Sequence, residues 1–230
     1  MPILHHHPFS SASRFIRLVL AEYDEDVELI EQKPWARDEA LLLVNPAGTL
    51  PIFVDHDGVA VSGAPVIAEY LSETRGARMG EVRLLPESPA DRAEVRRLVH
   101  WFTTKMHGEV TDYLATEKIF KRQMTQAEGG GSPNAAAIRA ARANIRYHLQ
   151  YIGWLAARRN WLGGRGLSFA DLAAAAELSV VDYLGEVPWE ADETAKAWYA
   201  RIKSRPSFRP ILAETMRGVP AATHYADLDF

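Results

Sequence analysis

The feature that most constrains the fold of this chain is a change of pattern near Pro86. Before this proline, apolar runs of strand length alternate with segments whose apolar residues recur at helical spacing. After it, strand signals vanish and only long helical patterns remain. The sequence therefore predicts an α/β domain over residues 1–76, a linker over 77–87, an all-helical domain over 88–212 and a C-terminal tail over 213–230.

The first domain is expected to contain its elements in the order β-α-β-α-β-β-α. Ser13 is a candidate N-cap of the first helix, and the pair Asn45-Pro46 should end the second helix. Residues 55–58, Asp-His-Asp-Gly, are typical of the turn of a β-hairpin. The expected strands cover residues 2–6, 27–31, 50–54 and 59–61, and the expected helices cover 13–23, 36–44 and 65–73.

The second domain is expected to contain four main helices. The first begins after Ser88, a candidate N-cap that is followed by Pro89 at the first helical position. The third begins at Ser168, where Asp171 stands three residues on as in a capping box and Leu167 is placed as a hydrophobic staple. The expected helices cover 88–121, 135–159, a stretch from 168 onward, and 192–204, with the breaker EGGGSPN between the first two.

Composition excludes several classes of protein. The formal net charge is −4, so the chain has no global attraction for phosphate and no nucleic-acid partner is expected. The absence of cysteine excludes disulfides, cysteine-ligated metals and a thiol nucleophile. No apolar stretch approaches the ~20 residues of a membrane span, and the N-terminus does not resemble a signal peptide. We therefore expect a cytoplasmic protein without membrane insertion.

Three consecutive histidines, His5, His6 and His7, raise the question of a metal site. In a strand, alternate residues face opposite sides, so only His5 and His7 share a face. No carboxylate or cysteine motif accompanies them. We therefore expect strand histidines that are half buried under helices, and no metal ion.

Three segments carry a specific resemblance to a known family. Residues 45–58, NPAGTLPIFVDHDG, resemble a family segment that reads NP.G.VP.L...G, with Pro51 at the position of a cis-proline. Residues 166–179, GLSFADLAAAAELS, resemble an N-capping box built on Ser168 and Asp171, and residues 195–212 resemble the ending W..R...RP....L. Together these motifs resemble the glutathione S-transferase superfamily. The resemblance implies a thioredoxin-like α/β N-terminal domain followed by an all-α C-terminal domain.

The same resemblance implies a glutathione site, in which a Glu-Ser pair at the start of the helix after the hairpin grips the γ-glutamyl end. In this chain the register of residues 67–71 places Gly63 and Ala64 at those two positions. Neither side chain can donate or accept a hydrogen bond, and each charge-assisted bond is worth about 1.5–3 kcal/mol. Losing both anchors should weaken glutathione binding ~100-fold or more. Ser62 would supply a hydroxyl if the register were shifted by one residue.

A candidate catalytic serine is better preserved. Residues 9–17, FSSASRFIR, resemble the SSCS.RVR segment of the zeta and related classes, which places Ser10 or Ser11 at the catalytic position. A serine at a helix N-terminus can stabilise a thiolate through its hydroxyl and the exposed amides. However, Ala12 replaces the family's cysteine and Phe15 its first arginine. The alternative is that the serines cap the helix and fill a polar turn, so Ser10 and Ser11 are vestigial candidates and no catalytic residue is predicted.

A basic patch is expected on the helical domain. Residues 129–170 contain no Asp or Glu but six arginines, and three lysine or arginine residues end the preceding helix. This set is either a docking surface for an acidic partner or a solvent-exposed face whose charges form ion pairs within the chain. We name as the basic patch Lys118, Lys121, Arg122, Arg139 and Arg142.

The tail and one loop tryptophan are further candidates. The ending HYADLDF interleaves aromatic and acidic residues, which suits a short recognition segment through Tyr225, Asp227 and Phe230. The alternative is a tail that folds over its own helical domain. Trp35 lies in the loop before the second helix and is either buried at an interface or exposed as a binding anchor.

The family motifs of the scaffold are present, whereas the polar residues of the ligand site are missing. This combination indicates a transferase fold that serves another function. Within the superfamily, the whole chain, including its HYADLDF ending, resembles the bacterial division proteins that bind filaments of the tubulin-like GTPase FtsZ. That resemblance implies a homodimer without enzymatic activity or cofactor, located at the division site and supporting constriction and septal wall synthesis. The alternatives are a glutathione-dependent transferase or isomerase that uses Ser10 or Ser11, and an adaptor for another partner.

Overall fold

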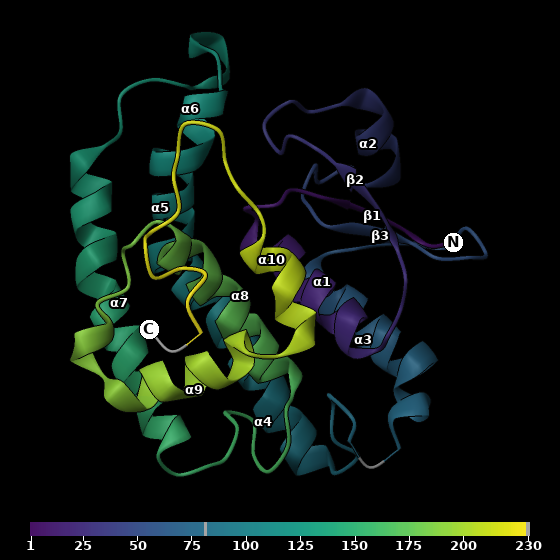
Figure 1. Ribbon diagram of the computed structural model, residues 1–230. Helices are drawn as coiled ribbons and strands as arrows, with labels where there is room; N and C mark the ends of the chain where they lie inside the picture. Colours follow the sequence, from purple (N-terminus) through teal and green to yellow (C-terminus); the bar gives the residue numbers. More distant parts are fainter. Residues whose placement is uncertain (81, 229–230) are drawn as a thin grey trace.

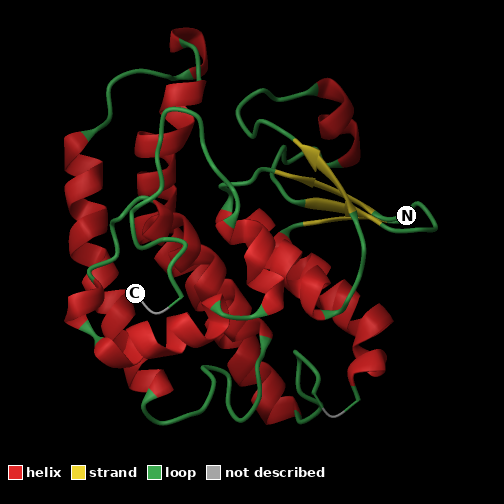
Figure 2. Cartoon of the chain, viewed as in Figure 1, coloured by secondary structure: helices red, strands yellow, loops and turns green. Residues whose placement is uncertain are grey.

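The N-terminal half forms a four-stranded mixed sheet. The computed structural model describes residues 1–80 and 82–228. The sheet has the order β2-β1-β3-β4, in which β2 runs parallel to β1 while β3 is antiparallel to both β1 and β4 (Figure 2). The strands are β1 (Ile3–His6), β2 (Glu28–Glu31), β3 (Ile52–Val54) and β4 (Ala60–Ser62).

The helices of this half are α1 (Ser11–Glu22), α2 (Glu39–Val44), α3 (Ala64–Arg75) and the short η1 (Gly76–Met79). The apolar residues of α1 recur at helical spacing, and Phe15, Ile16 and Val19 are fully buried. Helices α1 and α3 pack against each other on one side of the sheet, as Figure 1 shows, and α1 also packs against α8 of the second half. The predicted β-α-β-α-β-β-α order and the thioredoxin-like arrangement are confirmed.

The second half is entirely helical within the described residues. One long rod runs through α4 (Pro89–His100), η2 (Trp101–Thr111), α5 (Asp112–Ala115), η3 (Thr116–Phe120) and α6 (Lys121–Gln123), with η2 and η3 in π-helical form. The remaining helical elements are η4 (Gln126–Glu128), α7 (Ala135–Ala156), α8 (Phe169–Tyr183), η5 (Trp189–Ala191), α9 (Glu193–Lys203), η6 (Pro206–Phe208) and α10 (Arg209–Leu212).

Helix α8 is the centre of the molecule, because every one of its residues is buried. It packs against α1, α4, η2 and α9, so it joins the two halves into one core. The carboxylate of Asp171 accepts hydrogen bonds from the backbone N–H and the hydroxyl of Ser168, at 3.1 and 2.8 Å. The predicted pairing of Ser168 with Asp171 at the start of this helix is confirmed.

The start of the first helix differs from the prediction. Ser10, not Ser13, is the N-cap of α1, and its hydroxyl accepts the backbone N–H of Ser13 at 3.3 Å. Ser13 is fully buried, and its hydroxyl accepts the backbone N–H of His7. Since β1 ends at His6, only a few residues separate strand and helix, and the cap falls three residues earlier than expected.

Within residues 1–80 and 82–228, none of the helices combines the length and the apolar character that a bilayer span requires.

Candidate functional site

The start of α3 lacks polar side chains at the two positions predicted for the glutathione grip. Gly63 is the N-cap of this helix, with φ at 86°, and the helix has no side-chain hydrogen bond at its cap. Ala64 follows as the first helical residue and is 4% exposed. Neither position has a polar side chain that could hydrogen-bond to an α-amino or α-carboxylate group. These two positions therefore do not fit the γ-glutamyl end of glutathione.

The backbone around this point is preserved. The Leu50–Pro51 peptide bond is cis, as the resemblance predicted. The backbone N–H of Gly63 donates to the carbonyl of Pro51 at 3.4 Å, which joins the loop before β3 to the start of α3. Asn45 is buried and donates from its side chain to the carbonyl of Thr49 at 2.9 Å, which closes the loop from the other side. The scaffold of the ligand site is thus retained without its polar side chains.

Ser11 lies in an unexpected cluster between the two halves. It is 2% exposed, and its Oγ lies 3.2 Å from Nδ1 of His107 on η2. The same nitrogen lies 3.3 Å from Oε2 of Glu177, a residue of α8 that is also 2% exposed. Three elements that are far apart in the sequence therefore bring a hydroxyl, an imidazole and a carboxylate together.

The protonation state of this cluster argues against an activated serine. The carboxylate of Glu177 raises the pKa of His107 to about 9, although burial acts in the opposite direction. At neutral pH the imidazole is therefore charged and has no free lone pair for the proton of Ser11. In a nucleophilic triad the two ring nitrogens divide between serine and acid, whereas here one nitrogen faces both groups. The cluster holds the two domains together rather than activating a nucleophile.

Of the three consecutive histidines, His5 in β1 is half-buried as predicted, whereas His6 at the end of β1 and His7 just after it are buried more deeply than the sequence indicated. His7 is 0% and His6 is 5% exposed, and burial lowers their pKa values to about 4 and about 3. His7 packs its ring against those of Trp35 and Phe120, at centroid distances of 5.8 and 5.1 Å. In the part of the chain that the structure describes, no three His, Asp or Glu side chains are placed to hold a metal ion.

The basic patch contains ion pairs as well as free charge. Lys118 of η3 and Arg142 of α7 both contact Glu186, with Lys118 Nζ at 2.5 Å and Arg142 bidentate at 2.6 and 2.7 Å. Lys121 contacts Glu117 at 2.6 Å. The structure thus joins Lys118 and Arg142 through one buried carboxylate, which sequence reasoning did not find because Glu186 lies outside the basic segments.

Two members of the basic patch differ from these. Arg122 donates to the carbonyl of Gly218 at 2.8 Å, so it fixes the C-terminal tail to α6. Arg139 is exposed and forms no ion pair within residues 1–80 and 82–228. It lies one turn before Arg142 on the outer face of α7. Arg139 is therefore the member of the patch whose charge is most available to a partner.

Trp35 lies at the contact between the two domains. Its ring packs against that of Phe120, the residue before Lys121, at a centroid distance of 5.6 Å. The side chain is half-buried and its indole N–H has no hydrogen-bond partner within the described chain. Trp35 therefore takes the first of its two predicted positions, the one at an interface. This interface is the contact between the two domains, next to η3 and α6.

The tail folds over its own helical domain, and this corrects the expected role of Tyr225. Its side chain is 1% exposed, with the hydroxyl donating to the carbonyl of Ile211 at 3.2 Å and accepting from Arg14 at 3.3 Å. A ring that fills an internal site anchors the tail and is not available to a partner. Asp227 is exposed, near Lys203 of α9. The predicted contact Phe230 lies outside the described residues.

A second carboxylate that sequence reasoning missed holds the tail. Asp182 of α8 is fully buried and accepts hydrogen bonds from Trp189 Nε1 and His224 Nε2, each at 2.9 Å. The fully buried Lys203 lies 3.7 Å from the same carboxylate and donates to the carbonyl of His224 at 3.2 Å. An aspartate inside a fully buried helix is a signal of such a network, because a buried charge requires partners.

Comparison with known proteins identifies the family. A family model described as "Glutathione S-transferase, N-terminal domain" matches residues 9–74, and one described as "Glutathione S-transferase, C-terminal domain" matches residues 126–206. The chain belongs to the glutathione S-transferase superfamily. This agrees with the sheet order, the cis-proline and the capping box of α8 described above.

Several relatives within the glutathione S-transferase superfamily match nearly the whole chain. FtsZ-localized protein A of Caulobacter vibrioides is 42% identical over 230 residues, which is 99% of this chain and 97% of that protein. A crystal structure of FzlA from C. crescentus superimposes with a TM-score of 0.91 and 42% identity, covering 100% of this chain and 99% of that one. A crystal structure described as a glutathione S-transferase from Sinorhizobium meliloti 1021 gives a TM-score of 0.98 and 55% identity, covering both chains completely.

Proposed function

We propose that this protein is a non-enzymatic cell-division protein of the glutathione S-transferase superfamily, which binds FtsZ filaments as a homodimer. The observation that carries the proposal is the 42% identity with FtsZ-localized protein A, because it extends over 99% of the chain. The proposed role is to support constriction and septal wall synthesis from the cytoplasmic side of the division site. No cofactor is part of this function.

The geometry of the former ligand site supports a function other than transfer. Gly63 and Ala64 offer no side-chain hydrogen bond at the start of α3, and the hydroxyl of Ser10 is engaged as the cap of α1. Ser11 faces a charged imidazole that cannot accept its proton. The start of α3 therefore lacks the polar grip on the γ-glutamyl end that the family resemblance implies, and Ser11 has no base that would turn it into a nucleophile.

The proposed filament-binding surface combines the basic patch and the tail, and Trp35 acts indirectly, by packing on Phe120 next to Lys121. Arg139 supplies exposed positive charge on α7, and Asp227 supplies exposed negative charge on the tail. Ion pairs at the rim of an interface guide association more than they add affinity, so paired members such as Arg142 still contribute. Tyr225 acts indirectly, by holding the tail in place, and Phe230 is a further proposed contact that lies outside the described residues.

A homodimer suits this function, since two-fold symmetry presents the binding surface twice. Two copies of a weak site then act together, and the effective concentration of the second contact is raised. A cavity of about 140 Å³ opens between α3 and α4, with Ala68, Val95 and Val99 among its lining residues. We place the contact between protomers on this partly apolar face.

Sedimentation with GTP-assembled FtsZ from the same species tests the proposal. The wild-type protein should pellet with filaments and stay in solution when GTP is omitted. Arg139→Glu and Asp227→Lys should each reduce the bound fraction several-fold while the melting temperature stays unchanged. Arg78→Glu is a matched control, because Arg78 is an exposed arginine of η1, outside the helical domain. Wild-type protein that remains in the supernatant with filaments would contradict the proposal.

A glutathione-dependent transferase remains the second candidate, because the 55% identical relative is described as a glutathione S-transferase. Ser11 would then face the thiol, and the backbone near Pro51 would hold the peptide. Thermal denaturation with millimolar glutathione separates the two candidates. Binding at about 100 times the dissociation constant would stabilise the fold by about 2.7 kcal/mol, whereas the filament-binding function predicts no shift in melting temperature.

A further inference from the structure

One edge of the sheet in the first domain is not paired with another strand. Strand β2 is the outermost strand of the order β2-β1-β3-β4, so its hydrogen-bonded neighbour in the sheet is β1 alone (Figure 2). Among the described residues, β1 is also the only element against which β2 packs closely. The outer side of β2 can therefore receive the backbone of another chain.

The register assigns the backbone groups that face outward from β2. The N–H groups of Glu28 and Gln32 donate to the carbonyls of Pro2 and His6, at 2.9 and 2.7 Å, and so point toward β1. Successive residues of a strand direct their N–H groups to opposite sides. The N–H and C=O groups of Leu29 and Glu31 therefore lie on the outer side, where an added strand would find two donors and two acceptors.

An apolar row crosses the sheet and ends at this edge. The register places Phe53 of β3 beside Leu4 of β1, and Leu4 beside Leu29 of β2. Phe53 and Leu4 are both 0% exposed, whereas Leu29 is 44% exposed. Side chains in register on neighbouring strands share one face of the sheet and pack against each other. The row therefore lacks its outer neighbour, which a further strand would supply.

Acidic side chains surround this exposed leucine. Residues 24–32 contain five Asp or Glu and no Lys, Arg or His. Glu25 has arginine partners on α3 and η1, whereas the other four acids are exposed and form no ion pair within residues 1–80 and 82–228. We name as the acidic edge Asp26, Glu28, Leu29 and Glu31.

The nearest groups of the sheet do not neutralise these acids. His6 stands beside Glu31 in the register, but burial lowers the pKa of His6 to about 3, so its imidazole is uncharged at neutral pH. The nearest basic residue along the chain is Lys33, which follows the strand. The acidic edge therefore carries net negative charge.

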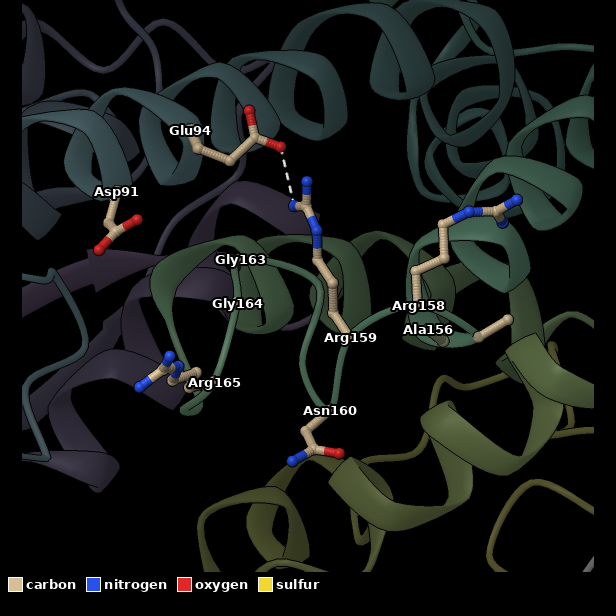
Figure 3. A pocket seen from close by; sticks show the side chains of 10 residues that line it. Asp91, Glu94, Ala156, Arg158, Arg159, Asn160, Gly163, Gly164 and Arg165 are labelled. Carbon is tan, nitrogen blue, oxygen red and sulfur yellow. Dashed lines mark hydrogen bonds and ion pairs between the residues drawn. The ribbon is translucent and has the colours of Figure 1, made fainter.

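A charged cavity near the end of α7 provides a contrast. This cavity of about 570 Å³ is lined by Arg158, Arg159 and Arg165, and Figure 3 shows their side chains. Asp91 and Glu94 also line it, and Arg159 pairs with Glu94 at 2.8 Å. Charges of both signs meet in that cavity, whereas the acidic edge presents charges of one sign and therefore selects a positively charged partner.

From this arrangement we infer that the acidic edge binds an extended, positively charged segment of a partner protein, which adds to the sheet as a fifth strand beside β2. The outward N–H and C=O groups of Leu29 and Glu31 pair with the backbone of that segment, which is the general mode of strand addition. The site goes beyond the proposed filament contact, since it includes no residue of the basic patch or the tail.

The side chains of β2 define the sequence that fits. Along the strand, Glu28, Leu29, Ile30 and Glu31 read acidic, apolar, apolar, acidic. Opposite charges and apolar pairs are the favourable neighbours across two strands. The segment should therefore read basic, apolar, apolar, basic. This pattern is the same in both directions, so it holds for parallel and antiparallel addition.

The charge of the edge argues against the other occupants. If a second copy of this chain paired its β2 in antiparallel fashion, Glu28 of each copy would stand opposite Glu31 of the other, and like charges directly opposite destabilise a strand pair. Nucleic acids and anionic membranes are repelled by the same carboxylates.

The proposed homodimer leaves this edge open. Its contact was placed between α3 and α4, and α3 packs against β3 and β4. Strands β2 and β4 are the two opposite edges of the sheet. Each protomer of the homodimer therefore presents its own acidic edge.

Selection of peptides against the purified protein tests this inference. A phage-displayed library of random 12-residue peptides is panned on the wild type after depletion on the double variant Glu28→Lys, Glu31→Lys. Enriched sequences should contain two basic residues that flank two apolar ones, and fluorescence anisotropy should show that binding weakens as salt is added. The double variant should raise the dissociation constant at least 10-fold. Glu73→Lys is the matched control and should leave it unchanged, because Glu73 is an exposed carboxylate of α3, which packs away from β2.

Backbone pairing is tested separately from charge. Leu29→Pro removes an outward N–H but leaves the hydrogen bonds to β1, so it should also raise the dissociation constant at least 10-fold. In a selected peptide, N-methylation of one alternate set of amides should abolish binding and methylation of the other set should not. NMR-detected hydrogen exchange should show that the amides of Leu29 and Glu31 become protected when the peptide is bound.

Several results would overturn the inference. These are the absence of enriched peptides, equal binding to all variants, and binding that leaves the exchange of Leu29 and Glu31 unchanged. Association of the wild type beyond a dimer that Leu29→Pro abolishes would also overturn it, because the occupant would then be a second copy. Co-sedimentation of the double variant with FtsZ filaments should equal that of the wild type, so the acidic edge and the proposed filament contact are tested independently.

Discussion

Replacing Arg14 with alanine should destabilise the whole protein, because one buried guanidinium joins three parts of the chain. Its side chain is fully buried on α1 and donates to the carbonyl of Pro8 at 2.7 Å, to Ser179 of α8 at 2.9 Å and to Tyr225 of the tail at 3.3 Å. It also pairs with Glu214 at 3.2 Å. Removing one partner of a buried ion pair costs about 3–5 kcal/mol.

The lower end of that range is expected for Arg14→Ala. Glu214 keeps Arg17 as a second partner, and Tyr225 keeps the carbonyl of Ile211, so few groups lose all their hydrogen bonds. A loss of about 3 kcal/mol lowers the melting temperature of a protein of this size by about 6–12 °C. Thermal denaturation followed by circular dichroism measures this shift.

Arg78→Ala provides the comparison for that experiment. The Arg78 side chain is 68% exposed and pairs with Glu25 at 3.4 Å, a geometry that contributes at most about 1 kcal/mol. If Arg14→Ala lowered the melting temperature no more than Arg78→Ala, the structural role assigned to Arg14 would be wrong.

Three further predictions concern other buried contacts. Gly153→Ala should destabilise the wild type, because its Cβ overlaps the carboxylate of Asp192, but should stabilise an Asp192→Ala variant by about 1 kcal/mol, as measured by urea denaturation. Asp171→Asn should lower the free energy of unfolding by about 1–3 kcal/mol for each donor that loses its acceptor, measured by the same urea denaturation. For His107, NMR titration should give a pKa near 9 that falls below 6.5 in Glu177→Gln. Because the folded-state pKa is raised, this ion pair stabilises the wild type fully below pH 6.5, and the contribution is lost as the pH rises through 9.

Features that depend on neighbouring residues in the sequence could be predicted. The pairing of Ser168 with Asp171 spans three residues, and the cis bond before Pro51 belongs to a local segment, so both follow from sequence motifs. The absence of polar groups at Gly63 and Ala64 follows from the register of α3. In these cases the residue type and its local position determine the geometry.

Features that depend on packing between distant segments could not be predicted. His107 and Glu177 are 70 residues apart and meet only because η2 packs against α8. Tyr225 looks like an exposed recognition residue because acidic residues follow it, but Arg14 supplies a buried partner 211 residues away. The three serines after Phe9 all suit an N-cap, and only the end of β1 selects Ser10.

The anchoring of the tail determines where a mechanical load on the end of the chain is carried. Tyr225 and His224 attach the last described residues to Arg14 of the first domain and to Asp182 of α8. A force applied to the residues that follow Tyr225 is therefore transmitted to the contact between the two domains, because the tail is attached there by hydrogen bonds.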